Sequence, residues 1–264
     1  MDAGLKELVA PAHWRTLDFI SDLHLEASAQ RTHALWIDYL SKTPADALFI
    51  LGDLFEVWVG DDQLGAEPSG FAAQCAQSLR DASQRLALFL MHGNRDFLMG
   101  SALMQHCQAT LLADPCILSV AGQNCLLSHG DALCLDDTAY LEFRRQVRSQ
   151  AWQTQFLARP LQERQALARQ MRQHSQQQQA LRSARGEGYA EVNAEAAMGS
   201  LQQAGANLLI HGHTHRPARH ELAPGYSREV LSDWDAQAEP VRAQILRLSW
   251  AEGQPAQLQR IDLT

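Results

Sequence analysis

Residues 47–53 read Ala47-Leu48-Phe49-Ile50-Leu51-Gly52-Asp53, a short apolar run that ends in a glycine and an aspartate. An unbroken apolar run bounded by turn residues is typical of a strand that is buried on both faces of a sheet. Similar runs occur on either side along the chain, at residues 17–20, 86–91, 125–128 and 207–210. We predict that these five runs are the central strands of the fold.

The segments between these runs predict the rest of the architecture. Helices are expected at residues 33–40 and 71–84, so the first half of the chain alternates strand and helix, which predicts an α/β fold with a largely parallel sheet. Residues 117–120 and 125–128 predict a hairpin around a turn at 121–124. A helix is expected at 190–203, closed by Gly205. Antiparallel strands at 228–234, 242–250 and 257–263 are expected to complete a second sheet.

The composition is that of a globular chain that is not basic. Its 264 residues are 46% hydrophobic with a mean hydropathy of -0.27, which is enough to bury a large core. Lys and Arg number 22 against 30 Asp and Glu, so the net charge is -8 with neutral His. This balance argues against a protein that coats nucleic acid, and no nucleic-acid partner is expected.

The sequence also bears on compartment and on cysteine chemistry. No apolar run approaches the roughly 20 residues that span a bilayer, and residues 1–15 lack the layout of a signal peptide, so a cytosolic protein is expected. The cysteines are odd in number and scattered without a C-x-x-C pair, which predicts small buried side chains rather than disulfides or a zinc ribbon. They are Cys75, Cys107, Cys116, Cys125 and Cys134.

Each predicted central strand is followed by side chains that can bind a metal ion. Because ligands of open α/β sheets bind beyond the carboxyl ends of the strands, we expect these loops to converge on one edge. A spacing of two on an extended chain would point Asp22 and His24, and likewise His213 and His215, the same way. A single such loop is more often a turn or a solvent-facing His, but five in register predict a metal site. The segments are Asp22-Leu23-His24, Gly52-Asp53, Gly93-Asn94-Arg95-Asp96, His129-Gly130-Asp131 and His211-Gly212-His213-Thr214-His215.

This order of motifs, D-x-H, G-D, G-N, H and G-H-x-H, resembles the calcineurin-like metallophosphoesterase superfamily from Leu17 to His215. The resemblance implies two mixed β-sheets flanked by helices, an α+β sandwich. It also implies two divalent metal ions, with Asp53 bridging them across about 3.5–4 Å. One ion would be held by Asp22, His24, Asp53 and His215, and the other by Asp53, Asn94, His129 and His213. Oxygen and nitrogen ligands suit manganese, iron or zinc.

Arg95 departs from the general superfamily pattern, in which a His follows the Asn and can protonate the leaving group. Arginine cannot donate a proton at neutral pH, but it can hold phosphate oxygens with two parallel hydrogen bonds. A leaving group that is already stable as an anion, such as a phosphate monoester, does not need the missing acid. The sequence therefore favours cleavage of a P–O–P linkage.

Longer strings resemble the family of UDP-2,3-diacylglucosamine diphosphatases of lipid A biosynthesis. They are residues 22–25, 52–62, 92–97 and 211–217, together with residues 129–131, Asp136, Asp137 and Tyr140. The resemblance implies that water activated by two metal ions, usually Mn²⁺, attacks the α-phosphorus and releases UMP and 2,3-diacylglucosamine 1-phosphate. It implies catalytic roles for Asp53, Asn94, Arg95 and His129. Substrate contacts are implied for Asn94, Arg95, Asp137, Tyr140, Arg172, Ser175 and His213, and for either Arg182 or Arg185.

Residues 142–185 differ in composition and charge from the rest of the chain. Nine Arg against two Glu give this segment a charge of +7 and leave -15 elsewhere. We predict a helical cap, residues 137–190, inserted within a single domain of residues 1–264. It is either an amphipathic hairpin with a solvated Arg/Gln face, or a cap whose apolar inner face holds acyl chains while outer arginines meet anionic lipid. The second alternative places the protein peripherally on the cytoplasmic side of the inner membrane.

Three other functions remain open on sequence alone. The first is another hydrolase of the superfamily, acting on nucleotide diphosphates, dinucleoside polyphosphates or cyclic nucleotides. The second is a nuclease with the basic cap as its track, which the acidic net charge disfavours. The third is a non-catalytic scaffold that keeps the fold, which the seven filled ligand positions disfavour.

Overall fold

A computed structural model describes residues 5–184 and 191–263. The central strands of its first sheet run parallel and are buried along nearly their whole length, as the apolar runs predict. The strand order is β12-β11-β2-β3-β4-β5. The bounds are β2 (Thr16–Ile20), β3 (Ala47–Leu51), β4 (Ala87–Met91), β5 (Ala109–Leu112), β11 (Gln244–Ser249) and β12 (Gln257–Asp262).

The second sheet has the order β1-β6-β7-β8-β10-β9. It contains the predicted hairpin of β6 and β7, whose turn at Ala121 and Gly122 has positive φ angles of 50° and 75°. Left-handed backbone at both turn residues matches the twist of the two flanking strands. The bounds are β1 (Lys6–Val9), β6 (Cys116–Val120), β7 (Gln123–Leu127), β8 (Leu208–His211), β9 (Ala218–Ala223) and β10 (Tyr226–Val230).

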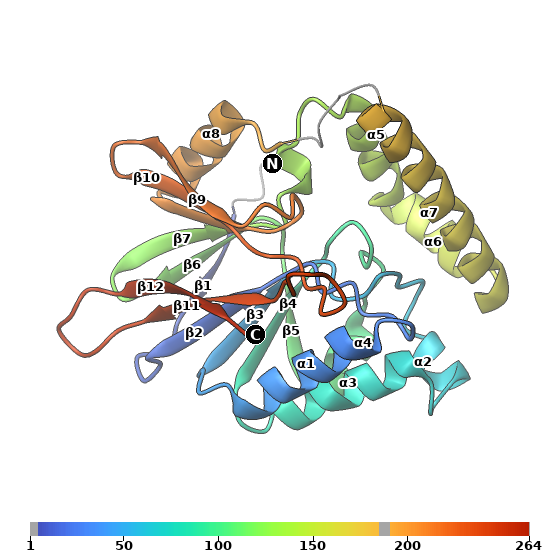
Figure 1. Ribbon diagram of the computed structural model, residues 1–264, viewed down its shortest axis with the longest axis horizontal. Helices are drawn as coiled ribbons and strands as arrows, with labels where there is room; N and C mark the ends of the chain where they lie inside the picture. Colours follow the sequence, from blue (N-terminus) through green and yellow to red (C-terminus); the bar gives the residue numbers. More distant parts are fainter. Residues whose placement is uncertain (1–4, 185–190, 264) are drawn as a thin grey trace.

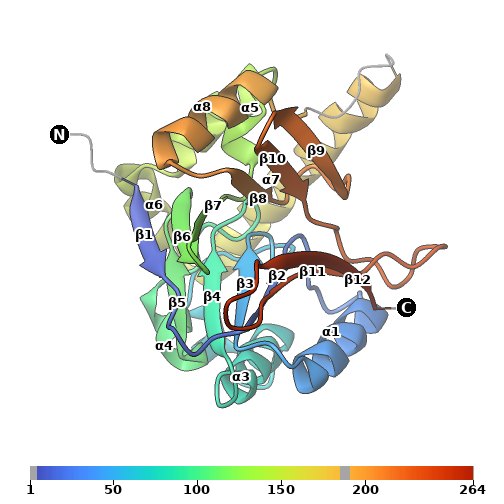
Figure 2. The same ribbon diagram turned by 90° about the vertical axis from the view of Figure 1, so that its left-hand side faces the viewer.

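The two sheets pack face to face with helices on their outer sides (Figures 1 and 2). Between them, the rings of Phe19, Phe49 and Phe89 stack at centroid distances of 5.0 and 4.7 Å and meet Leu118 and Ile210 of the second sheet. Helices α1 (Gln30–Lys42), α3 (Phe71–Ala82) and α4 (Ser101–Cys107) cover the first sheet, and α8 (Ala194–Ala204) covers the second. This confirms the predicted sandwich.

Three helices stand apart from the sandwich at one end of the molecule, on the right in Figure 1. They are α5 (Thr138–Val147), α6 (Gln150–Leu157) and α7 (Leu161–Ala184), preceded by the short helix η1 (Asp131–Leu133). We call residues 138–184 the cap. Its Phe156 is buried, and the ring of Trp152 stacks on that of Phe156 with 4.6 Å between the ring centroids. The centroid of the Trp152 ring also lies 6.1 Å from that of Phe97 in the main body. The short helix α2 (Gln63–Ala66) follows the loop after β3.

Some sequence predictions about the elements are wrong. The strand expected at 228–234 does not join the other two tail strands, because β10 runs parallel to β8 and antiparallel to β9 in the second sheet. Apolar alternation identifies a strand but not the sheet that receives it. Helix α8 begins at Ala194 rather than 190, since the side chain of Asn193 caps it by accepting from the amide of Ala196. Strands β1, β5 and β9 were not predicted.

The cysteines follow the prediction. All five are free and buried, and burial raises the pKa of the Cys125 thiol to about 12. None of the helices in the described part of the chain is long and apolar enough to cross a membrane.

Candidate active site

The loops after β2, β3, β4, β7 and β8 meet at one end of the sandwich. The prediction of a single sheet edge is therefore wrong, because the first three loops come from one sheet and the last two from the other. Backbone hydrogen bonds join neighbouring loops: the amide of Asp22 donates to Gly52 over 3.1 Å, and that of Gly212 donates to His129 over 3.0 Å. The site is built across the junction of the two sheets.

The backbone at the site is strained. Asp22, His24, Asp53, His213 and His215 have φ angles between 47° and 67°, and only two other non-glycine residues among those described have positive φ. The extended geometry expected for Asp22-x-His24 and His213-x-His215 is wrong. Left-handed backbone is uncommon for such residues and persists only where the surroundings hold it, so the strain marks a functional site.

One group of side chains contains Asp22, His24 and His215. Nε2 of His215 lies 3.3 Å from Oδ1 of Asp22 and 3.3 Å from Nε2 of His24. Asp22 is fully buried, and its other oxygen accepts from Ser21 Oγ and from the amide of His213. Burial alone would raise the pKa of Asp22, but the neighbouring imidazoles lower it well below its usual range. The carboxylate is therefore charged.

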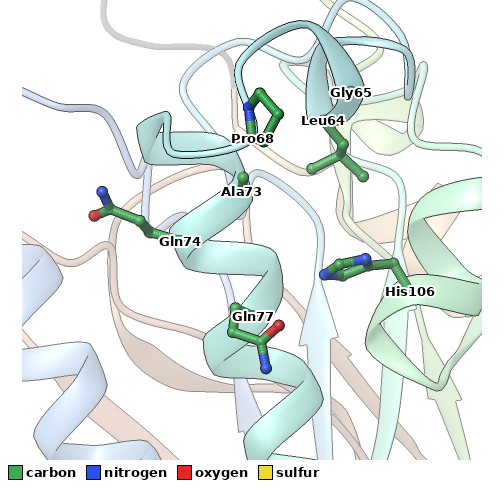
Figure 3. A pocket seen from close by; sticks show the side chains of 7 residues that line it. All are labelled: Leu64, Gly65, Pro68, Ala73, Gln74, Gln77 and His106. Carbon is green, nitrogen blue, oxygen red and sulfur yellow. The ribbon is translucent and has the colours of Figure 1, made fainter.

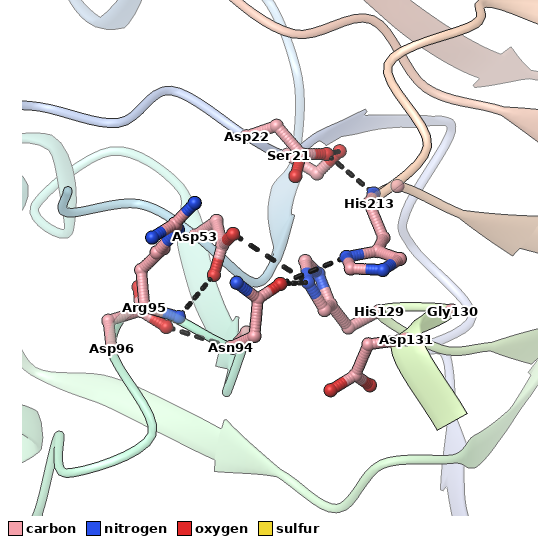
Figure 4. Close-up of polar contacts among 12 residues, drawn as sticks. Ser21, Asp22, Asp53, Asn94, Arg95, Asp96, His129, Gly130, Asp131 and His213 are labelled. Atoms are coloured by element: carbon pink, nitrogen blue, oxygen red, sulfur yellow. Dashed lines mark hydrogen bonds and ion pairs between the residues drawn. The ribbon is translucent and has the colours of Figure 1, made fainter. Parts of the chain in front are cut away.

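A second group contains Asn94, His129 and His213 (Figure 4). Oδ1 of Asn94 lies 3.0 Å from Nε2 of His129 and 2.9 Å from Nδ1 of His213. Asp53 lies between the two groups, because its Oδ2 is 4.0 Å from Nε2 of His24 and 3.8 Å from Nε2 of His129. The arrangement has one carboxylate in a position to bridge two cations.

The atoms that face the centre fit divalent metal ions. Oδ1 of Asp22 is buried without a hydrogen-bond donor, and Oδ1 of Asn94 faces two imidazole nitrogens that would themselves be ligands. Rotating the amide would direct its NH₂ at these nitrogens and its oxygen at Nε of Arg95, which is the arrangement expected without a cation. Burial would lower the pKa of His129, but Asp53, Asp22 and Asp131 raise it to about 9. A cation would relieve this excess of negative charge.

Polar groups lie beside Nδ1 of three imidazoles of the site. Nδ1 of His129 is within hydrogen-bond distance, 2.9 Å, of the carbonyl of Leu51. Nδ1 of His24 lies at ion-pair distance from Glu56, 3.1 Å, and Nδ1 of His215 lies 3.9 Å from Asp233. In each case Nε2 is left to face the centre. A partner on the far ring nitrogen fixes the tautomer and the ring orientation of a metal-binding His.

Asp96 and two glycines hold the loops in place. The carboxylate of Asp96 is fully buried and accepts from the amides of Gly93, Leu54 and Phe55, so it joins the loops after β3 and β4. A Cβ on Gly93 would overlap Asp53, and a Cβ on Gly212 would overlap Asp22. Glycine is required at both positions because the carboxylates of Asp53 and Asp22, and Ser21 beside Asp22, occupy that space.

His211 does not face the centre although it belongs to the same string as His213 and His215. It is fully buried, its Nδ1 lies 2.9 Å from the Gly212 carbonyl, and its Nε2 lies 3.2 Å from Arg228. Burial is the main cause that lowers the pKa of His211 to about 4. We assign it a structural role beside the Arg228–Glu191 ion pair.

Two cap arginines reach the site, whereas others, such as Arg159 and Arg169, are exposed. Nη2 of Arg148 donates to the Gly93 carbonyl over 2.9 Å, and Arg172 forms an ion pair with Glu56 at 2.5 Å. Arg164 is buried and pairs with Asp62. The backbone amide of Arg95 donates to Asp53. Burial is the main cause that lowers the pKa of Arg172, and the charge of the Arg95 guanidinium lowers it further.

The other predicted substrate contacts lie within residues 137–185 and differ in position. The Tyr140 ring stacks on His213 at 6.1 Å, and its hydroxyl donates to buried Asp131 over 2.5 Å. Asp137 caps α5 by accepting from the amide of Tyr140. Ser175 is exposed on α7, and Arg182 lies on the same helix without a described side chain. Arg185 lies outside the described residues.

The sequence analysis placed Asp96 and Asp131 in the metal-binding loops without giving them the supporting roles that the structure shows. It gave no role to Glu56 or Asp233, because Glu56 lies inside a longer motif and Asp233 lies in the strand expected at 228–234. A separate hollow between α2, α3 and α4 contains one ionisable side chain, His106, among its lining residues (Figure 3). It lacks the ligand set of the site described above.

The model of the calcineurin-like phosphoesterase family matches residues 15–217. This span includes the six side chains of the two groups and Asp53, which lies between them. The chain belongs to the calcineurin-like phosphoesterase family, and it is a metal-dependent hydrolase. Among solved structures, a Vps29 variant from Entamoeba histolytica aligns over 94% of this chain and 98% of its own, at 13% identity and a TM-score of 0.47.

Relatives named UDP-2,3-diacylglucosamine hydrolase are similar along most of the chain. The one from Cellvibrio japonicus is 44% identical over 225 residues, which cover 83% of this chain and 91% of the relative. The one from Hahella chejuensis is 46% identical over 226 residues, covering 82% and 88%. The one from Ralstonia nicotianae is 44% identical over 238 residues, covering 87% and 88%.

Proposed function

We propose that this protein hydrolyses UDP-2,3-diacylglucosamine to UMP and 2,3-diacylglucosamine 1-phosphate, a step of lipid A biosynthesis. The observation that carries the proposal is Arg95, whose amide donates to Asp53 beside the two ligand groups, where a general acid would otherwise stand. The names of relatives at 44–46% identity support the same substrate. Two metal ions, most simply Mn²⁺, would be held by Asp22, His24, Asp53 and His215, and by Asp53, Asn94, His129 and His213.

The reaction requires little acid–base chemistry from the protein. When bound, a pair of divalent cations makes water nucleophilic at neutral pH and neutralises charge on phosphoryl oxygens. Water adds to the α-phosphorus and loses its proton to solvent, and the bond between the α-phosphorus and the bridging oxygen breaks. The sugar 1-phosphate departs with the electron pair, while UMP keeps the oxygen of water. Arg95 would hold phosphoryl oxygens through its guanidinium, and no residue needs to protonate this leaving group.

The cap supplies a second cationic side chain, Arg172, and an aromatic one, Tyr140, beside the site. Arg172 lies close enough to Arg95 for their charges to interact, so a diphosphate placed between them would relieve that repulsion. Tyr140, held by Asp131 and stacked on His213, would contact the glucosamine together with Asp137. Ser175 and Arg182 or Arg185 would extend this contact along α7.

We further propose that the enzyme acts peripherally at the cytoplasmic side of the inner membrane. The cap exposes Phe143, Leu157 and Met171, and it also exposes Arg159 and Arg169. Apolar side chains beside arginines suit the interface of an anionic bilayer. The fraction of protein that sediments with anionic vesicles should decrease when salt is added, and also in the double variant Arg159→Glu, Arg169→Glu. If neither change reduces vesicle binding, this location is refuted.

The substrate is tested with the purified chain, Mn²⁺ and UDP-2,3-diacylglucosamine in water enriched in ¹⁸O. We expect UMP that carries one ¹⁸O and a sugar phosphate that carries none. UDP-N-acetylglucosamine is the matched substrate without acyl chains, and it should release UMP far more slowly. Equal release from both would leave a diphosphatase without lipid specificity, and label in the sugar phosphate would exclude attack at the α-phosphorus.

A further inference from the structure

Glu56 contacts both the ligand groups and the cap. One of its oxygens, Oε2, lies 3.1 Å from Nδ1 of His24, and the other, Oε1, lies 2.5 Å from Nε of Arg172 on α7. Residues 24 and 56 belong to the main body of the fold, whereas Arg172 belongs to the cap. A single carboxylate therefore touches a candidate metal ligand and a candidate substrate contact.

The backbone explains why Glu56 faces His24. The loops after β2 and β3 continue their parallel pairing beyond the strands, since the amide of His24 donates to Asp53, that of Leu25 to Leu54, and that of Glu56 to Leu25. Leu25 and Phe55 form an isolated parallel bridge and are both buried. This pairing fixes the backbone of residue 56 beside that of residue 24, so the Glu56 carboxylate can reach the His24 ring.

Glu56 lies between an imidazole of the main body and a guanidinium of the cap. The side chains of Glu56, His24 and Arg172 are all mostly buried, which strengthens charge interactions among them relative to water. An anion here is therefore stabilised by groups from the main body and from the cap.

We propose that Glu56 is a positioning residue that fixes His24 for metal binding and at the same time holds Arg172, so that the cap and the metal site are set by one side chain. Towards His24 it acts as an outer partner that orients the ring and leaves Nε2 to face the centre. Towards Arg172 it holds the guanidinium beside Arg95. The part concerning substrate rests on the proposed function, whereas the two contacts do not.

Three variants separate the two contacts. Glu56→Ala removes both of them. Glu56→Gln keeps an oxygen that can lie against Nδ1 of His24 but replaces the anion that Arg172 needs. Arg172→Ala removes the cap contact alone. Glu142→Gln is the matched control, because Glu142 is an exposed glutamate that pairs with a cap arginine, Arg145, away from the site.

The first measurement is calorimetric titration with Mn²⁺, which uses no substrate. We expect Glu56→Ala to weaken the binding of one ion by about 10-fold or more, the size of effect typical for losing an outer partner. Glu56→Gln, Arg172→Ala and Glu142→Gln should bind Mn²⁺ within about threefold of the unchanged protein. Mn²⁺ binding by Glu56→Ala at the unchanged affinity would overturn the proposal.

The second measurement is amide hydrogen exchange in residues 161–173 of α7, which also needs no substrate. Both Glu56 variants and Arg172→Ala should exchange faster there, while Glu142→Gln should not. Unchanged exchange in Glu56→Gln would disprove the link to the cap, even if Glu56→Ala binds metal weakly. If the wild-type protein releases no UMP from UDP-2,3-diacylglucosamine, the proposed function is refuted. The metal titration and the hydrogen exchange would still test the role of Glu56, because neither uses substrate.

Discussion

Asp53 is the residue on which both ligand groups depend. Its Oδ2 lies about midway between His24 and His129, at 4.0 and 3.8 Å from their Nε2 atoms. Asp53→Asn keeps the shape but removes the charge, so we expect kcat to fall by at least about 100-fold, more than is usual for an outer partner. UMP release, metal content and circular dichroism measure this. The control Asp38→Asn changes an exposed carboxylate paired with Lys42, and a fully active Asp53→Asn enzyme would contradict the two-metal mechanism.

Gly93 permits a prediction about space rather than charge. A Cβ at this position would overlap Oδ1 and the amide of Asp53. Gly93→Ala should therefore displace the bridging carboxylate, abolish tight Mn²⁺ binding and destabilise the fold by about 1–3 kcal/mol, as overpacking typically does. Urea unfolding and metal titration test it.

The matched control is Gly199→Ala. Gly199 lies inside α8, and a Cβ there would meet nothing within 4 Å. Alanine is the better helix former, so this change should stabilise the protein by about 0.5–1 kcal/mol without altering metal affinity. If the two variants gave the same result, the close approach of Gly93 and Asp53 would have no consequence.

Among the elements, α7 depends on one buried arginine. Arg164 is 2% exposed, donates to the carbonyls of Val59 and Arg159, and pairs with Asp62 in the loop after β3. Arg164→Ala should weaken the docking of α6 and α7 by about 1.5–3 kcal/mol, because charge-assisted hydrogen bonds to the main body are lost. Limited proteolysis with chymotrypsin should then cut the cap faster. Arg169→Ala, on the exposed side of the same helix, should leave cleavage unchanged.

The sequence predicted some strands correctly and missed or misplaced others. Strands such as β3 were predicted because they are buried on both faces and therefore apolar throughout. Strands β9 and β10 were missed or misplaced because their residues are mixed in polarity, and their place depends on pairing with β8. The ligand residues could be found because each follows a strand. Glu56 and Asp233 could not, since they reach His24 and His215 only after distant loops come together.

For the whole molecule, the positive charge of the cap serves mainly to dock it onto the main body, although its sum of +7 suggests a surface for anionic partners. Arg144 pairs with Asp131 and Asp114, Arg164 with Asp62, and Arg172 with Glu56. These arginines meet acids of the main body, so much of the +7 of residues 142–185 docks the cap onto a chain that is otherwise acidic. Only the exposed remainder, such as Arg159 and Arg169, is available to an anionic surface.

Metal ions should stabilise the molecule as a whole because the ligands come from both sheets. Asp22, Asp53 and Asn94 follow strands of the first sheet, and His129 and His213 follow strands of the second. A cation held by both binds the folded chain only, and free metal at 100 times its Kd adds about 2.7 kcal/mol. For a chain of this size that corresponds to about 5–10 °C in Tm. Calorimetric scans with Mn²⁺ and with EDTA should differ by this amount, and Asp53→Asn should lose most of the difference. A Tm that does not respond to either addition would mean that the two sheets are not joined by metal.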